Sequence, residues 1–171
     1  MATSSEVMQK LLDNAAKEGI AVSGETIPEE ILRQQAAVCK RVYDGVTSYC
    51  KGTDQISMIP MQYIQLGAYA GMLAFVWYRQ DPDALLLEDF PEKLMAGHRA
   101  EELGTLSWDM LGIQTGSDIA DQIDDHIRSL YIKALLAACD NGKAPMDQEH
   151  IDEAAGGMYR YGVLLAGGLA K

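Results

Sequence analysis

The sequence predicts an all-α protein, a single-domain bundle of about six helices around a central apolar helix at about residues 60–79. Three observations support this fold class. Strong helix formers (Ala, Leu, Met, Gln and Glu) are frequent, apolar residues recur at three- and four-residue spacing, and runs of β-branched or aromatic residues of strand length are hard to find. The chain has 171 residues, 48% of them hydrophobic and 23% charged, as in a folded domain of ordinary size. We therefore treat residues 1–171 as one helical domain.

Two helices are expected before residue 52. The first begins after Ser4 or Ser5 and ends at Gly19, because hydroxyl side chains cap helix N-termini and glycine commonly ends a helix. The second begins at Pro28, a residue that suits the first helical turn, and continues to Cys50 with apolar residues at helical spacing.

The central helix is predicted to begin near Pro60 and to end before Asp81. Its sequence, PMQYIQLGAYAGMLAFVWYR, is apolar nearly all round, which is typical of the buried centre of a bundle or of a membrane span. The length is marginal for a bilayer, and Gln62 and Gln65 interrupt the apolar run. A buried core helix is therefore the better interpretation, and no membrane span is expected.

Helical segments are also expected in the second half of the chain, since proline, glycine and capping residues divide it at regular intervals. A short helix should come first, then three longer ones, of which the last is capped by Asp147 and reaches the C-terminus. These segments are expected over residues 82–88, 90–111, 118–139 and 147–171.

The last helix contains five glycines, and each interior glycine costs about 1 kcal/mol relative to alanine. Packing, not helix propensity, must therefore hold this segment. The central helix carries a ridge of small residues that includes Gly67 and Gly71, and we expect the two helices to pack closely against each other. Breakage at Gly156-Gly157 and packing on another subunit are the alternatives.

The charge of the chain indicates the partners that it could bind. The formal net charge is −11, and residues 81–126 alone contain twelve acidic and two basic residues. Such a surface repels phosphate backbones, so direct nucleic-acid binding is not expected. A protein with a basic surface is the expected partner, and a homo-oligomer is an alternative.

An acidic face is predicted on the helix over residues 118–139. Residues three to four positions apart share one face of a helix, which can serve as a docking patch for a basic partner. A solvated surface without a partner is the alternative. The predicted patch comprises Asp118, Asp121, Asp124 and Asp125.

A small-ligand or metal-binding enzyme is the alternative function, with imidazoles and carboxylates brought together between helices. His98 precedes Glu101 and Glu102 by three and four residues, and His150 precedes Glu153 by three. Dinuclear metal sites in helical bundles use Glu-x-x-His pairs, and here the order is reversed. Surface ion pairs explain the same spacing without a metal.

Aromatic residues near the end of the central helix, together with others later in the chain, could line a ligand pocket between helices. Ordinary core packing is the competing interpretation. The residues concerned are Trp77, Tyr78, Trp108, Tyr159 and Tyr161.

No motif in the sequence specifies catalysis. There is no Gly-x-Ser-x-Gly elbow and no phosphate-binding loop, and His126 at the edge of an apolar stripe is interpreted as a boundary residue. The three cysteines form no CxxC pair and the first residues lack a secretory signal pattern, so a reducing, cytoplasmic location is expected. We expect a non-enzymatic adaptor, inhibitor or accessory factor without a cofactor.

Overall fold

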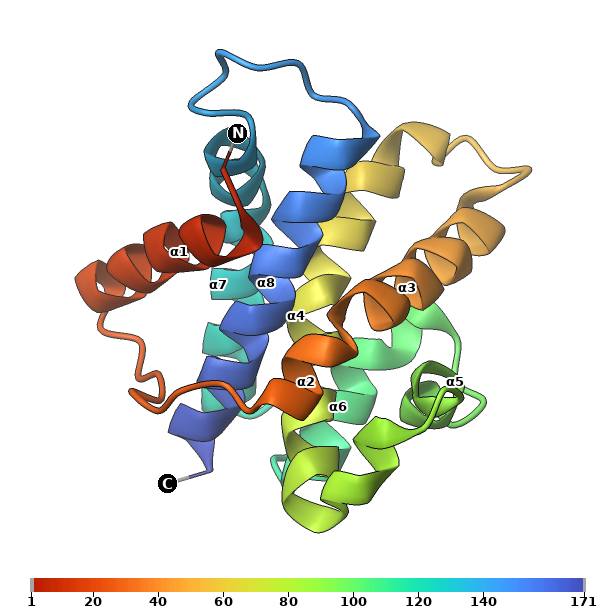
Figure 1. Ribbon diagram of the computed structural model, residues 1–171, viewed down its shortest axis with the longest axis vertical. Helices are drawn as coiled ribbons and strands as arrows, with labels where there is room; N and C mark the ends of the chain where they lie inside the picture. The colour runs from red at the N-terminus through yellow and green to blue at the C-terminus, as the bar shows by residue number, and fades with distance from the viewer. Residues whose placement is uncertain (1, 171) are drawn as a thin grey trace.

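Two long helices, α4 (Ile59–Gln80) and α8 (Gln148–Leu169), lie side by side through the centre of the molecule (Figure 1). The structure, a computed structural model, describes residues 2–170, and these form eight α-helices, three short 3-10 helices and no strand. The predicted all-α bundle is therefore confirmed. Twelve of the 22 residues of α4 are buried, which confirms the central apolar helix. Within residues 2–170, no helix has both the length and the apolar character to cross a bilayer.

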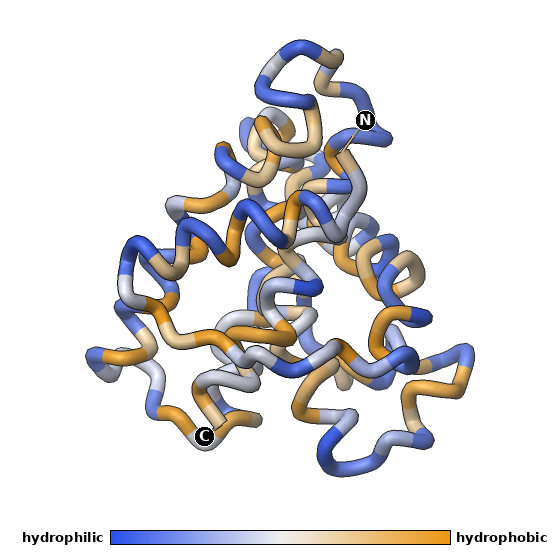
Figure 2. The backbone as a smooth tube through the Cα atoms, turned by 60° about the vertical axis from the view of Figure 1, so that its left-hand side comes forward, coloured by the Kyte–Doolittle hydropathy of each residue, from blue (hydrophilic) through white to orange (hydrophobic). Residues whose placement is uncertain are grey.

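The remaining helices cover this central pair from several sides. Helices α1 and α7 pack on α8 and on each other, whereas α3 and α6 pack on α4 (Figure 1). Hydrophilic and hydrophobic residues alternate along the outer helices (Figure 2), as expected where one face meets the core and the other meets solvent. The bounds of these helices are Ser4–Glu18 for α1, Gln35–Cys50 for α3, Leu103–Leu111 for α6 and Asp118–Ala138 for α7.

Glycines allow the backbones of α4 and α8 to touch. A Cβ atom at Gly71 would overlap the carbonyl oxygen of Tyr159, and one at Gly162 would overlap that of Ala68. The predicted close packing of the two glycine-bearing helices is confirmed, and it occurs within the chain. Because the contact is between backbones, no rearrangement of side chains could make room for a larger residue.

The N-terminal part of the chain packs closely against other glycines of α8. A Cβ at Gly157 would overlap the side chain of Val7 on α1, and one at Gly168 would lie 2.5 Å from the carbonyl oxygen of Ala21. Helix α8 continues through Gly156-Gly157 without a break, so the alternative of a broken helix is not observed.

Helix α1 is capped one residue earlier than expected. The hydroxyl of Thr3, not that of Ser4 or Ser5, accepts from the backbone N–H of Glu6 (3.2 Å), and the Glu6 carboxylate accepts from the N–H of Thr3 (3.1 Å). This reciprocal pair is a capping box. At the other end Gly19 adopts φ 72°, a left-handed conformation, and ends the helix as predicted.

The second predicted helix is interrupted at Gln34, between α2 (Glu29–Arg33) and α3. Here the expectation of one continuous helix is wrong, because tertiary hydrogen bonds compete with the helical ones. The hydroxyl of Tyr159 donates to the carbonyl of Ile31 (2.9 Å). In an unbroken helix, the backbone N–H of Gln35, one turn later, would donate to this carbonyl. The buried Gln34 amide also donates to the carbonyl of Leu85 (2.6 Å).

The predicted helix over residues 90–111 is also divided. Helix α5 (Phe90–Met95) ends where Ala96 and Gly97 take left-handed conformations, with φ of 49° and 81°. A 3-10 turn over Ala100–Glu102 then leads into α6. His98 consequently lies outside any helix, so its spacing of three and four residues to Glu101 and Glu102 does not place the three side chains on one helical face. The expected short helix after α4 is a 3-10 helix, Pro82–Leu86.

Candidate functional site

The exposed side of α7 carries most of the acidic residues predicted as a docking patch. Ser117 caps the helix, so Asp118 and Asp121 lie in its first turn, where carboxylates interact favourably with the helix dipole. Neither forms an ion pair with any of residues 2–170. Asp125 is also exposed, but it pairs with Arg128 (3.1 Å). Of the four aspartates predicted as the patch, Asp118 and Asp121 are therefore the two most available to a partner.

Asp124 is separated from the other three aspartates because its side chain turns toward the core. Its Oδ1 accepts from the hydroxyl of Tyr69 (2.5 Å) and from the indole Nε1 of Trp108 (3.1 Å). Burial, and then the hydrogen bond to Asp124, raise the pKa of Tyr69, so this hydroxyl remains a donor at neutral pH. The structure thus assigns Asp124 to the junction of α4, α6 and α7.

Toward the C-terminal end of α7, the side of the helix that carries the aspartates carries exposed apolar side chains instead. Ile132 and Leu136 are one turn apart and are 47% and 38% exposed. They follow Asp125 at helical spacing, so acidic and apolar residues occupy one continuous stripe. We call this stripe the α7 face, made of Asp118, Asp121, Gln122, Asp125, Ser129, Ile132 and Leu136.

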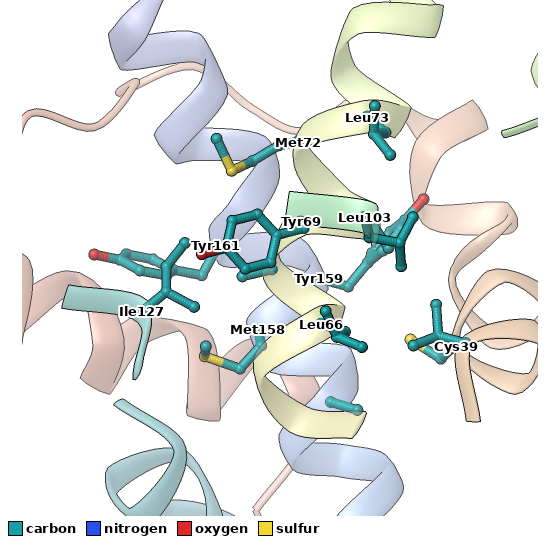
Figure 3. Packing of buried hydrophobic residues seen from close by; sticks show 14 of the residues in the cluster. Cys39, Leu66, Tyr69, Met72, Leu73, Leu103, Ile127, Met158, Tyr159 and Tyr161 are labelled. Carbon is teal, nitrogen blue, oxygen red and sulfur yellow. The ribbon is translucent and has the colours of Figure 1, made fainter. Parts of the chain in front are cut away.

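The five aromatic residues predicted to line one pocket do not converge on a single cavity. Tyr159 and Tyr161 are fully buried on α8 and point in opposite directions, Tyr161 toward Ile127 of α7 (Figure 3), and Trp108 is 1% exposed. Trp77 packs edge-on against Phe90, Tyr78 lines one surface depression together with Arg79, and Trp108 borders a different one beside Asp124. These residues build the core, as the competing interpretation of the sequence expected.

A buried hydrogen-bonded chain joins α1, α7 and α8. His126 Nδ1 contacts the carboxylate of Glu18, and Nε2 lies 2.6 Å from the hydroxyl of Tyr161. Burial lowers the pKa of His126 despite the carboxylate, and burial raises the pKa of Tyr161. Both imidazole nitrogens are therefore engaged within the fold, whereas the sequence interpretation expected a boundary residue.

The residues of the metal alternative are each engaged separately. His98 Nδ1 lies 3.3 Å from Glu102, and His150 Nδ1 lies 2.6 Å from Asp147 at the start of α8. Glu153 accepts from the hydroxyl of Ser4 (2.7 Å). Glu101, the remaining candidate, pairs with Arg99 at 2.8 Å. Among residues 2–170 no group of three or more His, Cys, Asp or Glu side chains is placed to hold a metal ion.

A groove of about 490 Å³ lies between α1, α3, α4 and α8, and the sequence interpretation did not anticipate it. The amphipathic spacing of α3 places apolar residues on the side that meets α4 and α8 (Figure 3). The sequence contains no signal for the crossing angles of these four helices, and those angles decide whether a space remains open between them. We call this cavity the Tyr43 groove, and its walls include Ala36, Cys39, Tyr43, Tyr63, Asp152 and Glu153.

Compared with known protein families, curated proteins and solved structures, the chain matches none of them.

Proposed function

We propose that this chain is a non-enzymatic interaction protein that binds a partner protein through the α7 face. The observation that carries the proposal is the stripe on which exposed aspartates are followed by the exposed aliphatic side chains of Ile132 and Leu136. Single exposed apolar residues are common on protein surfaces, but a pair one turn apart on the same helix stripe as exposed carboxylates is suited to an interface.

The composition of the stripe indicates the chemistry of the partner. Lysine or arginine residues would meet Asp118 and Asp121, and an apolar patch about three to five turns further along would cover Ile132 and Leu136. A basic amphipathic helix carries both features at matching spacing. Each exposed ion pair contributes only about 0.2–1 kcal/mol, so the apolar contact supplies affinity and the charges supply orientation and association rate.

The burial of the cysteine thiols and of the His126 imidazole supports a binding role and not a catalytic one. Burial raises the pKa of the Cys39 thiol to about 12, which keeps it protonated at neutral pH. His126 is buried with both imidazole nitrogens engaged within the fold. All three cysteines are free and buried, which supports a reducing, cytoplasmic location for this interaction.

The test begins with capture of binding proteins on immobilised chain and continues with one purified partner. The charge-reversal variant carries Asp118→Lys and Asp121→Lys, and the matched control carries Asp83→Lys and Glu88→Lys, two exposed acids in the segment between α4 and α5. Both variants change the net charge by the same amount. We expect the first to weaken binding by about tenfold or more and the control to leave it nearly unchanged.

A second variant, Ile132→Ser with Leu136→Ser, tests the apolar half of the α7 face. Both residues are exposed, so the fold should be retained and the circular dichroism spectrum unchanged. Binding should weaken without loss of salt dependence, because the aspartates remain. Equal affinity of the partner for wild type, the charge-reversal variant and the serine variant would contradict the proposal.

A further inference from the structure

The Tyr43 groove has the size and the walls of a small-molecule site. Its volume of about 490 Å³ falls within the range of roughly 300–1,000 Å³ that is typical of ligand pockets. Helices α3, α4 and α8 form its sides, and the beginning of α1 closes one end at Ser4. No residue of the α7 face lines it, so this site is independent of the proposed docking function.

The apolar part of the groove is aromatic. The rings of Tyr43 and Tyr63 meet edge to face, with 5.0 Å between their centroids. Tyr63 is buried, whereas Tyr43 is partly exposed on the groove side of α3. Cys39 and Ala36 extend this wall along α3. An aromatic wall attracts either an apolar body or a cation placed over a ring face.

Two carboxylates border the same wall. Asp152 Oδ1 accepts from the hydroxyl of Tyr63 (2.9 Å) and from the Gln148 amide (3.0 Å), and Glu153 Oε2 accepts from Ser4 (2.7 Å). These bonds fix the two side chains at the groove. No donor among residues 2–170 reaches Asp152 Oδ2 or Glu153 Oε1, and neither carboxylate forms an ion pair within that part of the chain.

The basic residue at the groove does not neutralise these carboxylates. Lys40 lines the groove, but its ammonium group pairs with Asp44 one turn further along α3 (3.1 Å). The groove therefore combines an aromatic wall with two oriented carboxylates that lack a cationic partner. An aromatic face together with carboxylates is the combination that recognises an organic cation.

We propose that the Tyr43 groove binds a small organic ammonium compound with an apolar or aromatic body. The ammonium group would donate to the open oxygens of Asp152 and Glu153, and the body would lie against Tyr43 and Cys39. The ammonium group of a lysine side chain has the same chemistry, so the test includes both sources.

The test measures binding by NMR titration of the full chain with phenethylammonium and two probes with the same phenethyl body, neutral 2-phenylethanol and anionic 3-phenylpropanoate. Nα-acetyl-lysine methylamide is the fourth probe and represents a protein side chain. We expect phenethylammonium to bind at least about tenfold more tightly than the alcohol, with shifts centred on Tyr43 and Tyr63, and the anion to bind more weakly than either. Tighter binding of the lysine amide than of phenethylammonium would overturn the assignment to a small free amine.

Variants separate the carboxylates from general surface charge. Asp152→Asn with Glu153→Gln keeps the size of both side chains and should weaken phenethylammonium binding by about tenfold or more. Glu149→Gln, an exposed acid on the same helix outside the groove, is the matched control and should leave binding unchanged. Ala36→Trp, at an exposed position of the wall, should block binding without disturbing the core.

Three further results would overturn the proposal. The first is equal affinity for phenethylammonium and phenylethanol, and the second is undiminished ammonium binding by the Asp152→Asn, Glu153→Gln variant. The third is the absence of saturable shifts at about 10 mM phenethylammonium, a concentration that reveals even weak specific ligands. Circular dichroism of each variant confirms that a loss of binding is not a loss of fold.

Discussion

Gly162 on α8 lies directly against the carbonyl of Ala68 on α4, with no space for a side chain between them. The reciprocal contact, Gly71 against the carbonyl of Tyr159, lies on the same interface. Two helices that meet through their backbones at both contacts cannot rotate or slide without a clash. This interface therefore fixes the axis around which α1, α3, α6 and α7 pack, and with it the position of the α7 face and of the Tyr43 groove.

Gly162→Ala should strongly destabilise the protein, by about 1–3 kcal/mol or more, because its methyl group would overlap backbone atoms. Gly104→Ala is the matched control. There a Cβ would be 3.6 Å from the ring of Tyr69, an ordinary contact, and the helix propensity of alanine should stabilise the fold by up to about 1 kcal/mol. Urea unfolding followed by circular dichroism measures both changes. Similar unfolding midpoints for the two variants would be inconsistent with backbone contact at Gly162.

Asp124→Ala and Asp125→Ala should differ, although the two residues are neighbours in an acidic run. The first change leaves the Tyr69 hydroxyl and the Trp108 indole without their acceptor, at a cost of about 1–3 kcal/mol. The second removes one exposed ion pair with Arg128 and should change stability by no more than about 0.5 kcal/mol. Chemical unfolding followed by circular dichroism measures both. Equal effects would argue against the inward position of Asp124.

His126 should make the protein less stable at about pH 5.5 than at about pH 7.5, since this interval spans the ordinary pKa of histidine. Burial lowers its pKa below the ordinary value of 6.5, so the unfolded chain binds more protons than the folded one between the two pKa values. Its contribution is therefore complete above the unfolded pKa and is lost as the pH falls toward the folded pKa. Glu18 and Lys133 face the imidazole from α1 and α7, with opposing effects, and the Tyr161 hydroxyl from α8 remains neutral.

The His126→Gln variant tests this dependence. Glutamine keeps a polar group at the position but does not titrate, so the variant should lose less stability on acidification than the wild type. The quantity to compare is the difference in unfolding free energy between the two pH values for each protein. Parallel losses in both proteins would show that another group is responsible.

The three cysteines should resist thiol reagents in the folded protein. All are buried, and burial raises the pKa of Cys39 to about 12 and also raises that of Cys139. At about pH 8 the native chain should react slowly with a disulfide reagent, whereas the denatured chain should release three equivalents promptly. Rapid reaction of one equivalent in the native state would place that thiol at the surface.

Residue patterns within single helices, such as capping residues, apolar spacing and glycine content, predicted much of the fold. Helices α4, α7 and α8 begin and end within one or two residues of expectation, because proline, serine and aspartate mark their starts locally. The glycines also predicted the α4–α8 contact, since five interior glycines require close packing to compensate for their low propensity.

Features that depend on contacts between distant residues could not be predicted in this way. The interruption at Gln34 arises from Tyr159, which is 128 residues from Ile31 in the chain. The inward turn of Asp124 likewise depends on Tyr69 and Trp108, although its spacing places it beside exposed aspartates. Helical spacing assigns a residue to a face, but the neighbouring helices decide whether that face is covered.

Site-specific photo-crosslinking tests the docking role of α7 most directly. A photoreactive amino acid at Gln122, an exposed position in the middle of the acidic half of the α7 face, should crosslink to the purified partner. The same amino acid at Glu88, exposed in the segment before α5, should not. Crosslinks from Gln122 that disappear in the Asp118→Lys, Asp121→Lys background are the predicted result. Crosslinks from Glu88 but not from Gln122 would contradict the account.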